Sequence, residues 1–162
     1  MRIPSFILIL IAALAIANPA YAEDVANQSV ADSVKARAQP LLKALSLIGT
    51  PYKFGGNNPQ KGLDCSGFVK HVYKESADIS LPRSASEMSR LGQQVAQTEM
   101  KPGDLVFFNT RKKPNSHVGI YVGDGEFVHA SSSRSKEVMI SRMGEKYWAN
   151  RFNGARRVLP TE

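Results

Sequence analysis

The hydrophobic period of the chain changes once along its length, and this change constrains the fold more than any other feature of the sequence. In the first part, apolar side chains recur at helical spacing, and we expect helices over residues 34–48, 65–73 and 84–91. Pro40 is tolerable near the first turn of the first helix. The apolar face of that helix is formed by Leu41, Leu42, Leu45 and Ile48.

Further along, the pattern alternates with a period of two, and Gly, Pro and Asn residues separate the alternating runs. We expect short strands over residues 104–109, 117–122, 126–130, 138–141 and 152–158. Helices followed by an antiparallel sheet indicate an α+β domain.

The first 22 residues are typical of a cleavable signal peptide. Met1-Arg2 supplies a positive start, an apolar run follows from Phe6 to Ala17, and Ala20-Tyr21-Ala22 fits a signal-peptidase site. The run is shorter than the roughly 20 apolar residues that span a bilayer, so we expect cleavage and not a retained anchor, which is the alternative. No cysteine follows that could carry a lipid. We therefore expect a periplasmic or secreted protein with no stable membrane anchor, a flexible segment over 23–38 and one domain over 39–162.

The formal net charge of +7 favours an anionic partner. Nucleic acid is not expected, because the chain is predicted to be exported and no basic run is interleaved with aromatic residues. A polymer of the cell envelope fits both the charge and the compartment. An ordinary solvated surface explains the charge equally well.

The single cysteine, Cys65, is the most informative residue of the chain. It cannot form an intramolecular disulfide, and a lone thiol in an oxidising compartment is a liability unless its reactivity is used. Asp64 precedes it as a candidate helix cap, so Cys65 stands at a predicted helix N-terminus, where backbone N–H groups favour a thiolate and can hold an oxyanion. The sequence therefore predicts a catalytic nucleophile. The alternative is a small buried hydrophobic residue.

Two of the three histidines are candidates for its partner. His71 follows Cys65 by six residues on the same helix and faces about 240° away from it, so we expect a surface residue. His117 and His129 lie on two strands joined through Gly123-Asp124-Gly125, which should form a hairpin.

The register of this hairpin decides whether the two imidazoles meet. With a three-residue loop, Gly119 faces His129 and the histidines are diagonal neighbours on one face, about 7–8 Å apart at Cα. With a two-residue Asp124-Gly125 loop they point to opposite faces. The functional interpretation therefore requires the longer loop or a bulge.

If the histidines meet, their roles follow from the chemistry. His117 would accept the thiol proton, or hold the thiolate as an ion pair, and later protonate the leaving amine. His129 would fix the tautomer and the orientation of His117. A zinc site built from the same three side chains is the rival use, although a thiol at a helix N-terminus is better arranged for nucleophilic attack.

Three blocks of the sequence resemble the signature of the NlpC-type cell-wall peptidases. They are Asp64-Cys65-Ser66-Gly67-Phe68, His117-Val118-Gly119-Ile120-Tyr121 and Phe127-Val128-His129-Ala130, and they occur in the family's order. The resemblance extends over about residues 41–158 and implies a papain-like fold, in which the cysteine helix packs against a central antiparallel sheet. It also implies hydrolysis of amide bonds in the peptide stems of murein (peptidoglycan), without a cofactor or a metal.

Carried over residue by residue, the resemblance implies that Cys65 is the nucleophile, His117 the base and His129 the third polar residue. Tyr52, Asp64, Ser66, Arg83 and Ser84 match positions near the nucleophile and are candidate substrate-binding residues. Three of them also have a simpler explanation: packing for Tyr52, capping for Asp64 and solvation for Arg83. An acyltransferase or amidase on the same scaffold and a silent envelope-binding module remain alternatives, and an adaptor protein could supply substrate capture.

Overall fold

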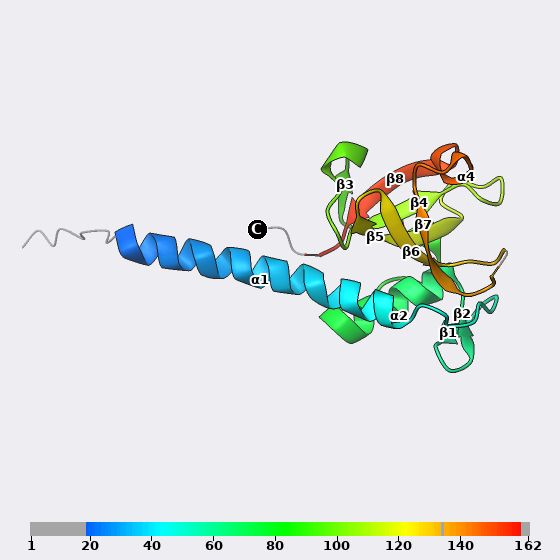
Figure 1. Ribbon diagram of the computed structural model, residues 1–162, viewed down its shortest axis with the longest axis horizontal. Coiled ribbons are helices and arrows are strands. Elements are labelled where there is room, and N and C mark those ends of the chain that lie inside the picture. Colours follow the sequence, from blue (N-terminus) through cyan, green and yellow to red (C-terminus); the bar gives the residue numbers. More distant parts are fainter. Residues whose placement is uncertain (1–18, 134, 160–162) are drawn as a thin grey trace, which may run out of the picture.

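A six-stranded antiparallel sheet and two long helices form the two main layers of the protein (Figure 1). The computed structural model describes residues 19–133 and 135–159. The strand order is β3-β8-β4-β5-β6-β7. The strands are β3 (Gln93–Val95), β4 (Leu105–Phe108), β5 (His117–Gly123), β6 (Glu126–Ala130), β7 (Val138–Arg142) and β8 (Phe152–Arg157).

The helices cover one face of this sheet. Helix α2 (Cys65–Ala77) packs against β5 and β6, and helix α1 (Pro19–Ser46) packs against α2. Residues of β5 alternate between the two faces, as a period of two requires. Val118 and Ile120 join the core beneath the helices, while His117 contacts the aromatic side chains on the opposite face. Phe108, Phe127, Trp148 and Phe152 belong to this second apolar cluster.

The five strands expected from alternation are all present, each within a few residues of its expected bounds, and the α+β prediction is confirmed. The shortest elements carry too little periodic signal to be predicted. They are β3, β1 (Asn57–Asn58), β2 (Gly62–Leu63), the 3₁₀ helix η1 (Gln97–Glu99) and α4 (Lys146–Ala149). The third expected helix is one turn long, α3 (Ala85–Met88), and begins at the cap Ser84.

Helix α1 differs most from the expectation, because it begins well before residue 34. It includes residues 23–38, which we expected to be flexible, and extends away from the sheet in Figure 1. The segment between Pro19 and Pro40 contains neither Gly nor Pro and is rich in good helix formers, which favours a continuous helix. Pro40 therefore lies in the helix interior and not near its first turn. Most of the expected signal peptide, residues 1–18, lies outside the described residues.

The buried face of α1 is also rotated from the expected one. Ala44 is fully buried and Leu41 and Leu47 pack beside it, whereas Leu42, Leu45 and Ile48 are exposed. Within the described part of the chain, no helix combines the length and the apolar character needed to cross a bilayer.

Candidate active site

The β5–β6 hairpin has a two-residue turn combined with a bulge. Tyr121 pairs with Phe127 and Gly123 pairs with Glu126, so that Val122 is the extra residue. Asp124 and Gly125 form the turn with positive φ angles of 51° and 73°, a conformation that suits Asp-Gly. Beyond the bulge, the register is the one that we derived for the longer loop, and it returns both histidines to the same face.

The two imidazoles are in direct contact. His117 Nε2 lies 2.9 Å from His129 Nδ1, and His129 Nε2 lies 3.0 Å from Ser141 Oγ on the neighbouring strand β7. The Trp148 ring is stacked on His117 with 5.4 Å between centroids and meets His129 edge-on. The histidines are almost completely buried, so the Trp148 ring and the sheet shield their hydrogen bond from water.

Cys65 is the first residue of α2, as its sequence context predicted. Asp64 caps the helix: its carboxylate accepts a hydrogen bond of 2.7 Å from the backbone N–H of Gly67. The Cys65 thiol is partly exposed and receives backbone hydrogen bonds from Val118, the neighbour of His117, and from Ser66. The thiol is thus held beside the start of β5, where His117 lies.

Electrostatics make the neutral thiol, and not the thiolate, the favoured state of Cys65. Burial and the Asp64 carboxylate raise the pKa of the thiol, and these effects outweigh the backbone N–H groups that lower it. This corrects the expectation that the helix N-terminus alone would produce a thiolate. Burial, with a smaller contribution from the Arg111 charge, lowers the pKa of His117 to about 4. The site therefore holds a neutral thiol next to a neutral imidazole at pH 7.

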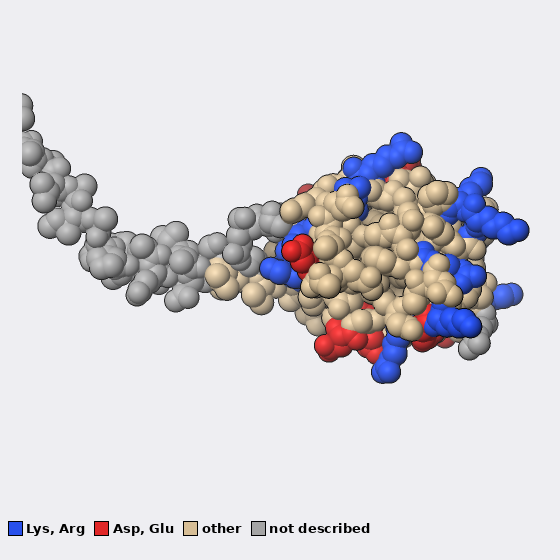
Figure 2. Space-filling view, turned by 90° about the horizontal axis from the view of Figure 1, so that it is seen from above, with Lys and Arg blue, Asp and Glu red and all other residues tan. Residues whose placement is uncertain are grey.

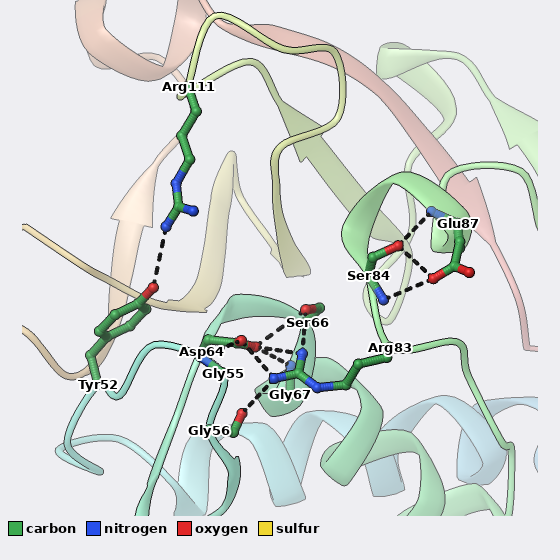
Figure 3. Close-up of polar contacts among 10 residues, drawn as sticks. All are labelled: Tyr52, Gly55, Gly56, Asp64, Ser66, Gly67, Arg83, Ser84, Glu87 and Arg111. Atoms are coloured by element: carbon green, nitrogen blue, oxygen red, sulfur yellow. Dashed lines mark hydrogen bonds and ion pairs between the residues drawn. The ribbon is translucent and has the colours of Figure 1, made fainter.

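Arg83 binds the cap residue of the cysteine helix (Figure 3). Its Nη1 and Nη2 donate to the two carboxylate oxygens of Asp64 at 2.9 and 2.6 Å, and Nη1 also donates to Ser66 Oγ at 2.8 Å. Nη2 reaches the carbonyl of Gly56 at 3.2 Å. The bidentate edge of Arg83, a candidate substrate-binding residue, is therefore occupied by Asp64.

Ser84 and Tyr52 also have partners within the protein (Figure 3). Ser84 caps α3 in a reciprocal arrangement with Glu87, in which each side chain accepts a hydrogen bond from the other residue's backbone N–H. The Tyr52 hydroxyl lies 3.4 Å from Arg111 Nη2, and burial and the neighbouring Cys65 raise the pKa of this phenol.

A cleft of about 830 Å³ connects these residues. Its lining includes the nucleophile and all five of the expected substrate-binding residues, Tyr52, Asp64, Ser66, Arg83 and Ser84. Five basic side chains line it, against Asp64 alone among acidic ones. Arg83 is paired with Asp64, whereas Arg90, Arg111, Lys113 and Arg156 form no ion pair with any described residue. The cleft thus has a positive potential that suits an anionic ligand. Basic side chains also project around much of the outline of the face shown in Figure 2.

Two glycines allow close packing around the site. A Cβ at Gly67 would lie 2.0 Å from the carbonyl oxygen of Gly56, so this glycine lets the 51–56 loop pack on the cysteine helix. A Cβ at Gly119 would lie 2.7 Å from the Phe127 ring and 3.3 Å from His129 Cβ. Gly119 therefore leaves room for the Phe127 and His129 side chains.

Three residues of the site were not predicted. Ser141 was inside an expected strand, but its contact with His129 depends on β7 pairing with β6. Trp148 and Arg111 come from a short helix and a loop without periodic signal. His71 is half-buried on α2 and does not line the cleft. Among residues 19–133 and 135–159, no group of three or more His, Cys, Asp or Glu side chains is arranged to bind a metal ion.

Comparisons with known proteins agree with this geometry. The profile of the NlpC/P60 family matches residues 49–157. The chain is 44% identical over 133 residues to a gamma-DL-glutamyl hydrolase of Bacillus subtilis, covering 82% of this chain and 32% of that protein. It is 40% identical over 155 residues to a probable endopeptidase NlpC of Escherichia coli, covering 94% of this chain and 99% of that protein.

The fold is also shared with solved structures. The crystal structure of an NlpC/P60 family protein from Bacillus cereus superposes with a TM-score of 0.70 at 32% identity, over 76% of this chain and 40% of that one. The likeness agrees with the papain-like α+β architecture. The chain spans 32% to 57% of the length of three of the curated relatives that it matches, the Bacillus subtilis hydrolase included.

Proposed function

Because the chain belongs to the NlpC/P60 family, we propose that it is an exported cysteine peptidase that hydrolyses amide bonds in the peptide stems or cross-links of murein. The observation that carries the proposal is that Cys65 lines a basic cleft with its thiol bonded to the N–H of Val118, the neighbour of His117, which in turn contacts His129. Relatives named murein DD-endopeptidases, at 39% and 46% identity, support murein as the substrate.

The pKa directions favour general-base catalysis over a preformed ion pair. His117 Nε2 is engaged by His129, so Nδ1 is the nitrogen left to accept the Cys65 proton as the sulfur attacks the carbonyl carbon. The tetrahedral oxyanion would be held by N–H groups at the start of α2, with the Tyr52 hydroxyl as a further donor in the cleft. The His117 imidazolium then donates its proton to the leaving amine, which leaves a thioester on Cys65. Water, deprotonated by His117, hydrolyses the thioester and restores the thiol.

The charge of the cleft supports a substrate whose acyl half carries carboxylates. Four cations that form no ion pair with any described residue line the same cleft as Cys65, and murein stems contain free carboxylates beside their amide bonds. Asp64, Ser66 and Arg83 act in this proposal mainly by fixing the start of α2 and only secondarily by contacting substrate. Ser84 lines the cleft while its hydroxyl caps α3.

The decisive experiment uses defined muropeptides. Protein lacking residues 1–22 is incubated with monomeric stems and with cross-linked dimers, and the products are read by mass spectrometry. We expect cleavage that is absent in the Cys65→Ser variant. In H₂¹⁸O, hydrolysis places one ¹⁸O in the new carboxylate, whereas acyl transfer to an amine places none. The proposal fails if no substrate shows a mass change that depends on Cys65.

A further inference from the structure

A second cavity, of about 350 Å³, lies over strands β6 and β7, and nothing in the mechanism above uses it. Residues of the β6–β7 connection, including Ser131 and Ser133, line one side, and Glu145 and Trp148 at helix α4 line another. Of the residues that the structure describes, none lines both this cavity and the Cys65 cleft. We refer to it as the β7 cavity.

The β7 cavity and the cleft approach the histidine pair from different directions. His129 lines the β7 cavity and Cys65 lines the cleft, while His117 lies between them in contact with His129 and Trp148. The centroids of the two imidazoles are 4.9 Å apart. An extended peptide advances about 3.3 Å per residue, so the separation of the imidazoles corresponds to one or two residues of an extended substrate.

The described residues that line the two cavities differ in charge. Among them, those of the β7 cavity include one carboxylate, Glu145, and neither Lys nor Arg. Glu145 is exposed and forms no ion pair with any described residue, and its side chain does not cap α4. Arg151 packs over the Tyr147 ring and donates to the Tyr147 carbonyl, and it does not line the cavity. Hydroxyl oxygens of Ser131 and Ser133 add further acceptors.

We propose that the β7 cavity binds the amine half of the substrate and that Glu145 recognises a free ammonium group there. An ammonium has three donors and no acceptor, which suits a pocket with one carboxylate and several hydroxyl oxygens. The enzyme would then distinguish the two halves of its substrate by charge. Carboxylates of the acyl half would bind in the basic cleft, and a cationic side chain of the amine half would bind in the β7 cavity. This inference rests on the proposed peptidase function, because it presupposes a peptide that crosses His117.

The test measures binding, so that it does not require turnover. The probes are an L-Ala-γ-D-Glu-L-Lys-D-Ala peptide and the same peptide acetylated on the lysine side chain, titrated calorimetrically into full-length Cys65→Ala protein. We expect the free lysine peptide to bind about fivefold more tightly, as for one partly exposed charge pair. Adding Glu145→Gln should equalise the two affinities. Adding Glu75→Gln, which removes the same charge from an exposed position on α2, should preserve the difference.

The outcomes separate this inference from the proposed function. Equal affinities in the Cys65→Ala protein, a difference that persists with Glu145→Gln, or no binding of either peptide would overturn the role of the β7 cavity. Cleavage of muropeptides by the wild-type protein is measured separately and decides the peptidase proposal alone. Loss of the preference with Glu145→Gln but not with Glu75→Gln would support the assignment.

Discussion

Ser141 Oγ lies 3.0 Å from His129 Nε2, at the other end of the imidazole ring from the 2.9 Å contact with His117. This arrangement links the tautomers of the two histidines. If His117 accepts the thiol proton at Nδ1, its Nε2 carries hydrogen and donates to His129 Nδ1. His129 must then carry its own hydrogen on Nε2, with the Ser141 hydroxyl as acceptor.

We expect Ser141→Ala to lower kcat about tenfold and to leave KM little changed, because the buried Nε2–H of the productive His129 tautomer loses its acceptor. Ser141→Thr keeps the hydroxyl and should retain most of the activity. Steady-state kinetics on a muropeptide, with circular dichroism to confirm folding, measure both variants. Full kcat in a folded Ser141→Ala protein would show that Ser141 does not position His129.

The Asp64 carboxylate is expected to influence the reactivity of Cys65. Its negative charge raises the pKa of the thiol, so Asp64→Asn should lower that pKa and increase the thiolate fraction at neutral pH. The rate of alkylation by iodoacetamide as a function of pH reports this change. Asp78→Asn, at the other end of the same helix, is the matched control and should leave the alkylation profile where it is in the wild type. An unchanged profile in Asp64→Asn would contradict this electrostatic effect.

The strands and the candidate triad were predictable because their signals are local. Strand β6 was predicted with its observed bounds, since Phe127-Val128-His129-Ala130 lies between a glycine turn and a serine-rich loop. A chain with one cysteine and three histidines leaves few candidates for nucleophile and base. The Asp124-Gly125 turn restricted the hairpin to two registers, although the bulge at Val122 that selects between them depends on packing.

What could not be predicted depends on long-range contacts. The Arg83 guanidinium meets Asp64 across 19 positions of sequence, and this contact changes Arg83 from an expected substrate ligand into a support of the cysteine helix. Trp148 contacts His117 although β6 and β7 separate the two residues in the sequence. Whether the pKa of the Cys65 thiol is raised or lowered depends on its burial. The position of Cys65 at a helix N-terminus does not by itself reveal this burial.

Gly67 provides a test of how tightly the 51–56 loop packs on the cysteine helix. A Cβ there would meet the Gly56 carbonyl oxygen at 2.0 Å, and that carbonyl also accepts hydrogen bonds from Asp64 N and Arg83 Nη2. We expect Gly67→Ala to lower the free energy of unfolding by at least about 2 kcal/mol in urea denaturation. Gly144→Ala is the control, because a Cβ there has no neighbour within 4 Å. Equal stability of the two variants would contradict the close approach.

Protonation of the buried histidines should make the fold sensitive to acid. Burial lowers the pKa of His117 to about 4 from an ordinary value of 6.5, and it lowers the pKa of His129 as well. As the pH falls below 6.5, the unfolded chain binds protons that the folded protein does not, so folding stability is lost until the pH approaches 4. His117 alone should reduce the free energy of unfolding by about 2 kcal/mol between pH 7 and pH 5.

Urea denaturation at pH 5, 6 and 7 measures this slope. His117→Gln should flatten it, whereas His71→Gln, a change at a half-buried position outside the cleft, should flatten it less. Asp and Glu residues contribute little to the slope in this range, because their ordinary pKa values lie near 4. A slope in His117→Gln equal to that of the wild type would mean that His117 is not held neutral by burial, and the general-base route would lose its electrostatic support.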